Sequence, residues 1–178
     1  MSTKQDEEDA IDRVLAGDTA AFSTVVERWQ GPLVNLAYRF CRDRGRAEDM
    51  AQEAFLRAFR GLGSWRRDSA FSTWLFALAT NAYRTEMRRM TPESIPMDDE
   101  LTPTASAEET AAESCRRSTV HRALHSLPPK YRDPLILFYF HDRDIAATAL
   151  CLELPEGTVK ARLSRGRAFL KSKLGTRL

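Results

Sequence analysis

The sequence predicts an all-α protein made of two small helical domains joined by a flexible acidic linker. Apolar residues recur at spacings of three and four through most of the chain, and no stretch has convincing strand character. Residues 91–114 lack this pattern, so we expect one domain over residues 1–90 and another over residues 115–178. The 178 residues are enough for two small cores.

The first domain is expected to begin with two helices. Residues 6–16 form a short acidic helix that Gly17 ends, and Asp18 is placed to cap the helix that follows. Pro32 is expected to bend or restart that second helix. A basic turn over Arg42–Arg46 then leads into the next helix.

The helix after Arg46 carries two distinct faces. One is a continuous apolar stripe made of Ala47, Met50, Ala51, Ala54, Phe55, Ala58, Phe59 and Leu62. The other carries Asp49, Gln52, Glu53 and Leu56. This second face is either a solvated acidic surface or a polar docking surface with one apolar contact residue, an arrangement typical of binding hot spots.

Aromatic and basic residues alternate after the Gly61–Arg67 turn, in a long helix expected from about Ser69 to Met90. Its core stripe is Phe71, Trp74, Leu75, Leu78, Ala79 and Ala82. Another face carries Asn81, Arg84 and Arg88. Arginines supply phosphate contacts, aromatic rings stack on unpaired bases and asparagine reads a base edge, although most of these aromatics also fit a protein core.

The linker is predicted from composition alone. Residues 91–114 contain three prolines and seven acidic residues but no basic one, with many Ser, Thr and Ala. Low hydrophobicity and charge of one sign do not support a packed core, so a flexible tether is expected.

The second domain ends in a predicted helix-turn-helix. We expect four helices, over residues 113–126, 131–140, 144–152 and 156–174. Pro128 and Pro129 break the first from the second, and the second is a buried apolar helix too short to span a membrane. A turn over Glu153–Pro155 joins the last two, which is the arrangement of a helix-turn-helix.

The last helix is strongly basic. From Glu156 to Leu178 there are seven basic residues and one acidic residue. Its inward face is Val159, Leu163, Gly166 and Leu170, and another face is Lys160, Ser164, Arg167 and Lys171. A basic face is either merely solvated or binds a DNA groove, and the charge excess favours the groove. The amides of Gly157, Thr158 and Val159 are suited to a phosphate.

Two parts of the sequence resemble one protein family. AEDMAQEAFLRAF followed by SAFSTWLFALATNAYR resembles region 2 of the extracytoplasmic-function (group 4, sigma-70 family) sigma factors, and LPEGTVKARLSRGRAFLK resembles their region 4. The resemblance implies an alternative sigma factor that binds core RNA polymerase and directs promoter-specific initiation. Region 2 would dock on the polymerase clamp helices and melt and read the −10 element. Region 4 would read the −35 element, and the linker would pass near the RNA exit path.

The resemblance assigns roles to individual residues. Polymerase binding is expected from Asp49, Gln52, Glu53 and Leu56. Contacts to the −10 element, with a base flipped out of the opened DNA, are expected from Trp65, Arg66, Arg67, Asp68, Ser69, Ala70, Asn81, Arg84 and Arg88. Contacts to the −35 element are expected from Gly157, Thr158, Lys160, Ala161, Ser164, Arg165 and Arg167.

One position departs from the family pattern. Glu153 stands in the turn where the family usually has glycine. A left-handed backbone at glutamate costs about 1 kcal/mol, so the turn is expected to be strained or differently shaped.

No enzyme, cofactor or metal site is expected. Cys41, Cys115 and Cys151 are far apart without a CxxC pair and are interpreted as buried free thiols. His121 and His125 are spaced as a metal pair but lack a third ligand, so a surface or capping role is favoured. We expect a cytoplasmic protein, because neither a signal peptide nor a membrane span is evident.

Two other classes of protein are alternatives to the sigma factor. A stand-alone helix-turn-helix regulator would need a dimer and a sensing site, and neither is evident. An interaction protein without DNA would leave the basic last helix unexplained. Members of the sigma family are commonly held inactive by an anti-sigma factor, often at the membrane, and the resemblance implies such a partner here.

Overall fold

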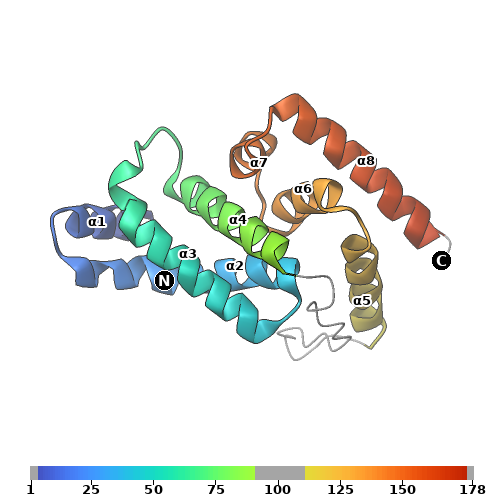
Figure 1. Ribbon diagram of the computed structural model, residues 1–178, viewed down its shortest axis with the longest axis horizontal. Helices are drawn as coiled ribbons and strands as arrows, with labels where there is room; N and C mark the ends of the chain where they lie inside the picture. Colours follow the sequence, from blue (N-terminus) through green and yellow to red (C-terminus); the bar gives the residue numbers. More distant parts are fainter. Residues whose placement is uncertain (1–3, 91–110, 176–178) are drawn as a thin grey trace. The chain divides into compact units, whose positions relative to one another are not determined.

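The computed structural model describes residues 4–90 and 111–175, which form two compact units (Figure 1). Every regular element in these two ranges is a helix, which confirms the predicted all-α class. The predicted linker, residues 91–114, lies almost entirely outside the described ranges.

The N-terminal unit is a bundle in which one helix contacts three others. Its elements are α1 (Lys4–Leu15), η1 (Thr19–Ala21), α2 (Phe22–Cys41), α3 (Arg44–Gly61), η2 (Leu62–Ser64) and α4 (Phe71–Arg89). Helix α2 packs against α1, α3 and α4, and α3 packs against α4. The predicted apolar stripe of α3 is buried apart from the half-buried Phe59.

Two aromatic residues of α4 belong to the core. Phe76 is 1% exposed and meets the Trp29 ring edge-on, with 5.9 Å between ring centroids. Tyr83 is also 1% exposed, lies 6.1 Å from Phe40 and donates its hydroxyl hydrogen bond to Leu33 O at 3.3 Å. Both rings therefore belong to the core of the unit and are not available to stack on a base.

Helix α1 is fixed to α2 by a buried carboxylate. Trp29 Nε1 donates to Glu7 Oε2 at 2.6 Å, and Arg28 Nε lies 3.0 Å from the same oxygen. A buried charge is costly unless it is paired and hydrogen-bonded, and both conditions are met here. Ile11, which is fully buried, completes the contact surface of α1.

The connection between α2 and α3 differs from the prediction. Pro32 lies inside a continuous α2, and this helix ends at Cys41 and is followed by Arg42, whose φ is 59°. Asp43 then caps α3 by accepting a hydrogen bond from Arg46 N at 2.8 Å, so α3 begins at Arg44. The predicted basic turn over Arg42–Arg46 is therefore wrong, because a single left-handed residue and a capping aspartate are enough.

The expected cap at Asp18 is also not formed. Asp18 precedes η1, but its side chain makes no capping hydrogen bond there. Instead its Oδ2 accepts from Arg13 Nη2 at 2.5 Å, and this hydrogen bond holds the pKa of the carboxyl below its ordinary value.

The C-terminal unit is built around its last helix. Its helices are α5 (Ala111–His125), α6 (Pro129–Phe140), α7 (Ile145–Leu152) and α8 (Glu156–Gly175). Helix α8 packs against α5 and α6. The buried residues that the sequence placed here include Leu135, Ile136, Leu137, Val159 and Leu163. The apolar run of α6 is not wholly buried, since Tyr139 is 49% and Phe140 37% exposed.

The predicted helix-turn-helix is formed by α7 and α8. Asp144 caps α7 by accepting from Ala147 N at 2.7 Å. Glu153 adopts the left-handed conformation with φ of 53°, as its place in the turn predicts, and Leu154 N donates to Ala149 O at 3.0 Å. This bond closes the C-terminus of α7 in the usual way, with glutamate at the position that glycine normally occupies.

Glycine is required at the crossing of α8 and α6. Gly166 is buried, and a Cβ added there would lie 2.9 Å from Leu135 Cδ1 and 3.3 Å from the backbone oxygen of Tyr131. Only a residue without a Cβ lets the two helices approach this closely.

Candidate functional site

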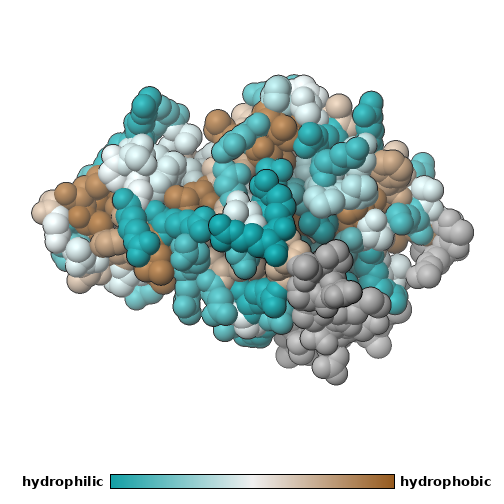
Figure 2. Space-filling view, viewed as in Figure 1, coloured by the Kyte–Doolittle hydropathy of each residue, from teal (hydrophilic) through white to brown (hydrophobic). Residues whose placement is uncertain are grey.

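The polar face of α3 lies on the surface, as the sequence predicts. Asp49, Gln52 and Glu53 are exposed, and Leu56 is 50% exposed among them. Arg57 Nε lies 2.7 Å from Glu53 Oε1, an ion pair within the helix. Figure 2 shows hydrophilic surface over much of the visible face of the molecule, interrupted by hydrophobic patches.

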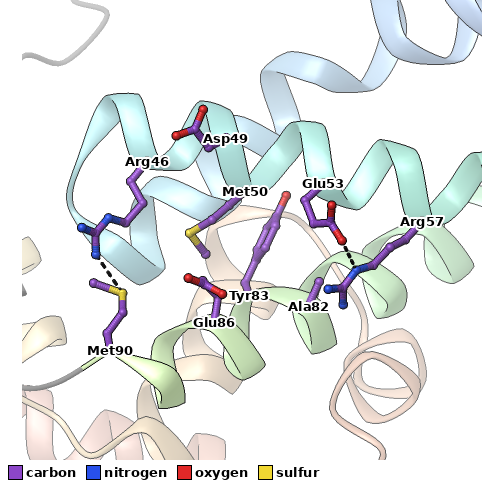
Figure 3. Close-up of a pocket in the computed structure, with 9 residues that line it drawn as sticks. All are labelled: Arg46, Asp49, Met50, Glu53, Arg57, Ala82, Tyr83, Glu86 and Met90. Atoms are coloured by element: carbon purple, nitrogen blue, oxygen red, sulfur yellow. Dashed lines mark hydrogen bonds and ion pairs between the residues drawn. The ribbon is translucent and has the colours of Figure 1, made fainter.

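A groove of about 470 Å³ runs beside this face, between α3 and α4. Figure 3 shows its lining side chains, which are Arg46, Asp49, Met50, Glu53, Arg57, Ala82, Tyr83, Glu86 and Met90. Arg46 reaches across the groove, and its Nη1 lies 3.0 Å from Met90 Sδ. The groove adds one charged residue of α4, Glu86, to the surface that α3 presents.

The loop between η2 and α4 has a defined conformation. Trp65 Nε1 donates to Ser69 O at 3.2 Å, and the Trp65 ring meets Phe71 edge-on at 5.2 Å. Arg67, whose φ is 62°, places its guanidinium 5.3 Å from the centre of the Trp65 ring and pairs with Asp12 of α1. The loop residues at 66, 67, 68 and 70 are exposed, as a DNA contact requires.

The other candidate −10 residues lie further along α4. Asn81 and Arg84 are half-buried, and Arg88 is exposed and donates from Nε to Arg84 O at 3.1 Å. Asn81 is ten residues after Phe71, which corresponds to about 15 Å of helix. The loop and the arginine face of α4 therefore do not form one cluster.

The predicted basic face of α8 is open to solvent. Lys160, Ala161, Ser164, Arg165 and Arg167 are all exposed. Lys160 Nζ lies 3.8 Å from Glu156 Oε2, and Arg167 Nη1 donates to Tyr139 Oη of α6 at 3.2 Å.

The backbone amides at the start of α8 differ from the expectation. Thr158 N and Val159 N donate to Pro155 O at 2.9 and 3.1 Å. These two amides are already used within the chain, so only Gly157 N of the three expected donors is left for a phosphate. The basic side chains of α8, rather than its N-terminal amides, therefore make up most of the candidate DNA surface.

Family models match both units in the expected order. A model of sigma-70 region 2 matches residues 25–92, and a model of sigma-70 region 4 matches residues 117–170. The chain is 32% identical to the RNA polymerase sigma-H factor of Pseudomonas aeruginosa, over 98% of this chain and 96% of that protein. The chain belongs to the sigma-70 family, in the extracytoplasmic-function (ECF) group. It is also 32% identical to the ECF RNA polymerase sigma factor SigW of Bacillus subtilis, over 92% of this chain and 94% of that protein.

Two solved structures share the fold of this chain. CnrH in complex with the cytosolic domain of CnrY has a TM-score of 0.72 at 22% identity and covers 95% of this chain and 97% of its own. The sigma factor RpoE with the anti-sigma factor NepR from Bartonella quintana has a TM-score of 0.68 at 22% identity, covering 88% and 98%.

Membership of this sigma family sets the activity and the partners. ECF sigma factors are non-enzymatic initiation factors whose regions bind core RNA polymerase and promoter DNA, which confirms both partner predictions. In the described residues, no three side chains of His, Cys, Asp or Glu come together as a metal site, and no helix is long and apolar enough to cross a membrane. His121 and His125 stack on one another at 5.5 Å. Cys41 is a buried free thiol.

Sequence reasoning missed two residues that contact the candidate sites of this sigma factor. Asp12 pairs with Arg67 from 55 positions away, and Tyr139 accepts a hydrogen bond from Arg167 across 28 positions. No local pattern indicates either contact, because each joins different helices or a helix and a loop. Tyr139 had a weak signal, since it is a polar-tipped aromatic near the end of an otherwise apolar run.

Proposed function

We propose that three surfaces of this sigma factor have separate roles in transcription initiation. The polar face of α3 docks on core RNA polymerase, the Trp65–Ala70 loop with the arginine face of α4 reads the opened −10 element, and the basic face of α8 reads the −35 element. Each unit alone offers few phosphate contacts. Binding to the polymerase brings both to one promoter and raises the effective concentration of each on DNA.

The half-exposed Leu56 is the observation that best supports the docking surface. It lies among Asp49, Gln52 and Glu53, away from the buried stripe of α3, and is 50% exposed. An apolar side chain surrounded by polar ones is the usual composition of a protein contact surface.

The docking surface is tested by the double substitution Asp49→Ala with Gln52→Ala. We expect weaker capture of purified core polymerase with an unchanged circular-dichroism spectrum. Glu48→Ala is the matched control, because Glu48 is an exposed acid of the same helix that pairs with Arg44 at 3.3 Å. Unchanged capture of core by the double variant would show that the docking surface lies elsewhere.

The −10 surface is supported by its mixture of exposed arginines and a positioned indole. Arg66 and Arg67 are exposed beside the half-buried Trp65 ring. Phosphate contacts position such a surface on the strand, and a flipped base is then bound by stacking and hydrogen bonds. Opening the duplex costs a few kcal/mol per flipped base, which these contacts offset.

The −35 surface is tested by Lys160→Ala with Arg165→Ala. Both side chains are exposed on α8, and each removed cation lowers the number of phosphates or base edges contacted. Promoter-specific transcription should fall much more than core binding, whereas the control Lys173→Ala, in the last turn of α8, should change neither by more than about twofold. Equal losses of core binding and transcription would contradict the assignment of α8 to DNA.

The decisive experiment is run-off transcription with purified bacterial core polymerase on genomic fragments, with and without this chain. New discrete start sites would establish promoter-specific initiation and reveal both promoter elements. DNA binding without any transcript or core binding would instead favour a stand-alone regulator.

We further propose that the protein works in the cytoplasm under the control of an anti-sigma factor, which in turn holds it at the membrane. One structural relative supports this, since the sigma factor RpoE from Bartonella quintana was solved in complex with the anti-sigma factor NepR. A protein that copurifies with the chain from its host and, once purified, competes with core polymerase for it is the expected finding. The absence of any competing protein from both membrane and soluble fractions would contradict this control.

A further inference from the structure

The Trp65–Ala70 loop forms an ion pair with α1, a helix far away in the sequence. The Arg67 guanidinium forms an ion pair with Asp12 Oδ1 of α1, while it also lies 5.3 Å from the centre of the Trp65 ring. Arg67 has a positive φ of 62°, a conformation that an arginine adopts only where its surroundings favour it. The ion pair is one such contact, because it fixes where the long side chain points.

The partner helix is a firm support for this contact. Helix α1 is attached to α2 through buried Glu7, which accepts from Trp29 Nε1 at 2.6 Å and pairs with Arg28 at 3.0 Å. Ile11, beside Asp12, is fully buried. The loop, in contrast, is closed on itself by the bond from Trp65 Nε1 to Ser69 O. Asp12 therefore connects the Trp65–Ala70 loop to a rigid part of the N-terminal unit.

We propose that Asp12 is a positioning residue for the recognition of the −10 element. This inference rests on the proposed role of the loop in binding a flipped base. By holding Arg67 against the Trp65 ring, Asp12 keeps the loop in one conformation before DNA arrives. A pre-ordered loop loses less conformational entropy when it closes on the base, so the correct base is favoured more strongly over the others.

Asp12 acts on selectivity rather than on total DNA affinity. Its carboxylate is negative and close to the loop, so it also repels the DNA backbone. Removal of the carboxylate loosens the loop but strengthens non-specific attraction. The quantity that isolates positioning is therefore the ratio of transcription from a matched −10 element to transcription from the same promoter with one −10 base changed.

The expected effect is modest. The two side chains are 49% and 59% exposed, and ion pairs in such positions contribute little because water screens them. We therefore expect the ratio of matched to mismatched transcription to fall about two- to fivefold when the ion pair is removed.

The test uses holoenzyme assembled from the full chain and purified core polymerase, on a promoter mapped by run-off transcription. Asp12→Ala, Arg67→Ala and the double variant are compared with the matched control Asp9→Ala. Asp9 is an exposed acid of the same helix that accepts from Gln5 Nε2 at 3.0 Å within α1, so its removal changes the charge but not the loop contact. Thermal unfolding of each variant confirms that the unit stays folded.

We expect Asp12→Ala to lower the ratio about two- to fivefold, Asp9→Ala to leave it unchanged, and the double variant to lose no more than Arg67→Ala alone. An unchanged ratio for Asp12→Ala, equal effects of Asp12→Ala and Asp9→Ala, or additive effects of Asp12→Ala and Arg67→Ala would each overturn the positioning role while leaving the sigma function intact. No promoter-specific transcript from the unsubstituted chain would overturn the proposed function itself.

Discussion

Replacement of Gly166 by alanine tests the packing that positions the basic face of α8. In most helix interiors this change is stabilising, since alanine favours the helix by about 1 kcal/mol over glycine. At the crossing with α6, however, the new methyl would lie 2.9 Å from Leu135 Cδ1 and 3.3 Å from Tyr131 O. The sign of the effect therefore depends on whether these two neighbours can move.

Neither neighbour moves easily. Leu135 is 1% exposed, so its methyl group cannot turn into solvent, and Tyr131 O is backbone of α6. Overpacking of a core typically costs about 1–3 kcal/mol, and a clash with backbone belongs near the upper end. After the gain in helix propensity, we expect Gly166→Ala to destabilise the C-terminal unit by about 2 kcal/mol, or about 10 °C in Tm for a domain of this size.

The two units can be followed separately in one experiment. All three tryptophans, Trp29, Trp65 and Trp74, lie in the N-terminal unit, so tryptophan fluorescence reports its unfolding, whereas circular dichroism reports helices of both units. Gly166→Ala should lower the Tm of the C-terminal unit only. This shift appears in circular dichroism but not in tryptophan fluorescence. The control Gly157→Ala, in the first turn of the same helix α8 with nothing within 4 Å of the added Cβ, should instead stabilise the C-terminal unit by up to about 1 kcal/mol. If Gly166→Ala stabilised the protein as well, the close crossing of α6 and α8 would be refuted.

Three further substitutions have expected outcomes. Asp43→Ala removes the side-chain cap of α3 and should lower the stability of the N-terminal unit by about 1 kcal/mol, measured by urea unfolding with tryptophan fluorescence. Glu153→Gly relieves a left-handed backbone and should raise the stability of the C-terminal unit by up to about 1 kcal/mol, measured by circular dichroism, and a loss of stability would show that the glutamate side chain contributes more than its backbone costs. Burial raises the pKa of Tyr83 above its ordinary value of 10.0, so the folded protein keeps a proton that the unfolded chain releases. Stability should therefore fall above about pH 10 by up to about 1.4 kcal/mol per pH unit for this group, and Tyr83→Phe should remove that part of the slope.

The faces of α3 and α8 could be predicted because each helix buries one stripe. The apolar spacing of α3 separates the buried Ala47 and Ala54 from the exposed Asp49 and Leu56 without any knowledge of the neighbours. The same holds for Val159 and Leu163 of α8. Where one side of a helix is buried and the other solvated, periodicity is sufficient evidence.

Helix α4 shows where that reasoning fails. It packs against both α2 and α3, so its buried surface is wider than one stripe. Phe76 turns toward Trp29 of α2 and Tyr83 toward Phe40 of the same helix, although both lie off the stripe that begins at Phe71. A periodicity argument that assumes a single packing partner does not assign these rings to the core. Their proximity to arginines in the sequence then suggests a role in nucleic-acid binding, which their burial excludes.

Two helix starts in the N-terminal unit differ from the prediction for another reason, which is that a capping side chain can bond a neighbouring side chain instead of the backbone. Asp18 and Asp43 are equally good capping residues in sequence, yet only Asp43 caps a helix. Asp18 lies within reach of Arg13 and bonds its guanidinium, whereas Asp43 is left to accept from Arg46 N. Capping propensity describes what an aspartate can do in isolation, and the arrangement of the preceding turn decides which partner it takes.

Sequence patterns also do not predict the tertiary contacts that orient side chains on the proposed DNA surfaces. Arg67 and Arg167 can be proposed from the sequence as DNA-binding cations, but each is oriented by a residue from another element, Asp12 or Tyr139. An arginine whose guanidinium is already held loses less side-chain freedom on meeting a phosphate or a base than one that samples all its rotamers. The chemical type of a DNA-binding surface is thus local and readable in the chain, whereas its selectivity depends on tertiary contacts such as these, which is why the substitution at Asp12 is expected to change discrimination more than affinity.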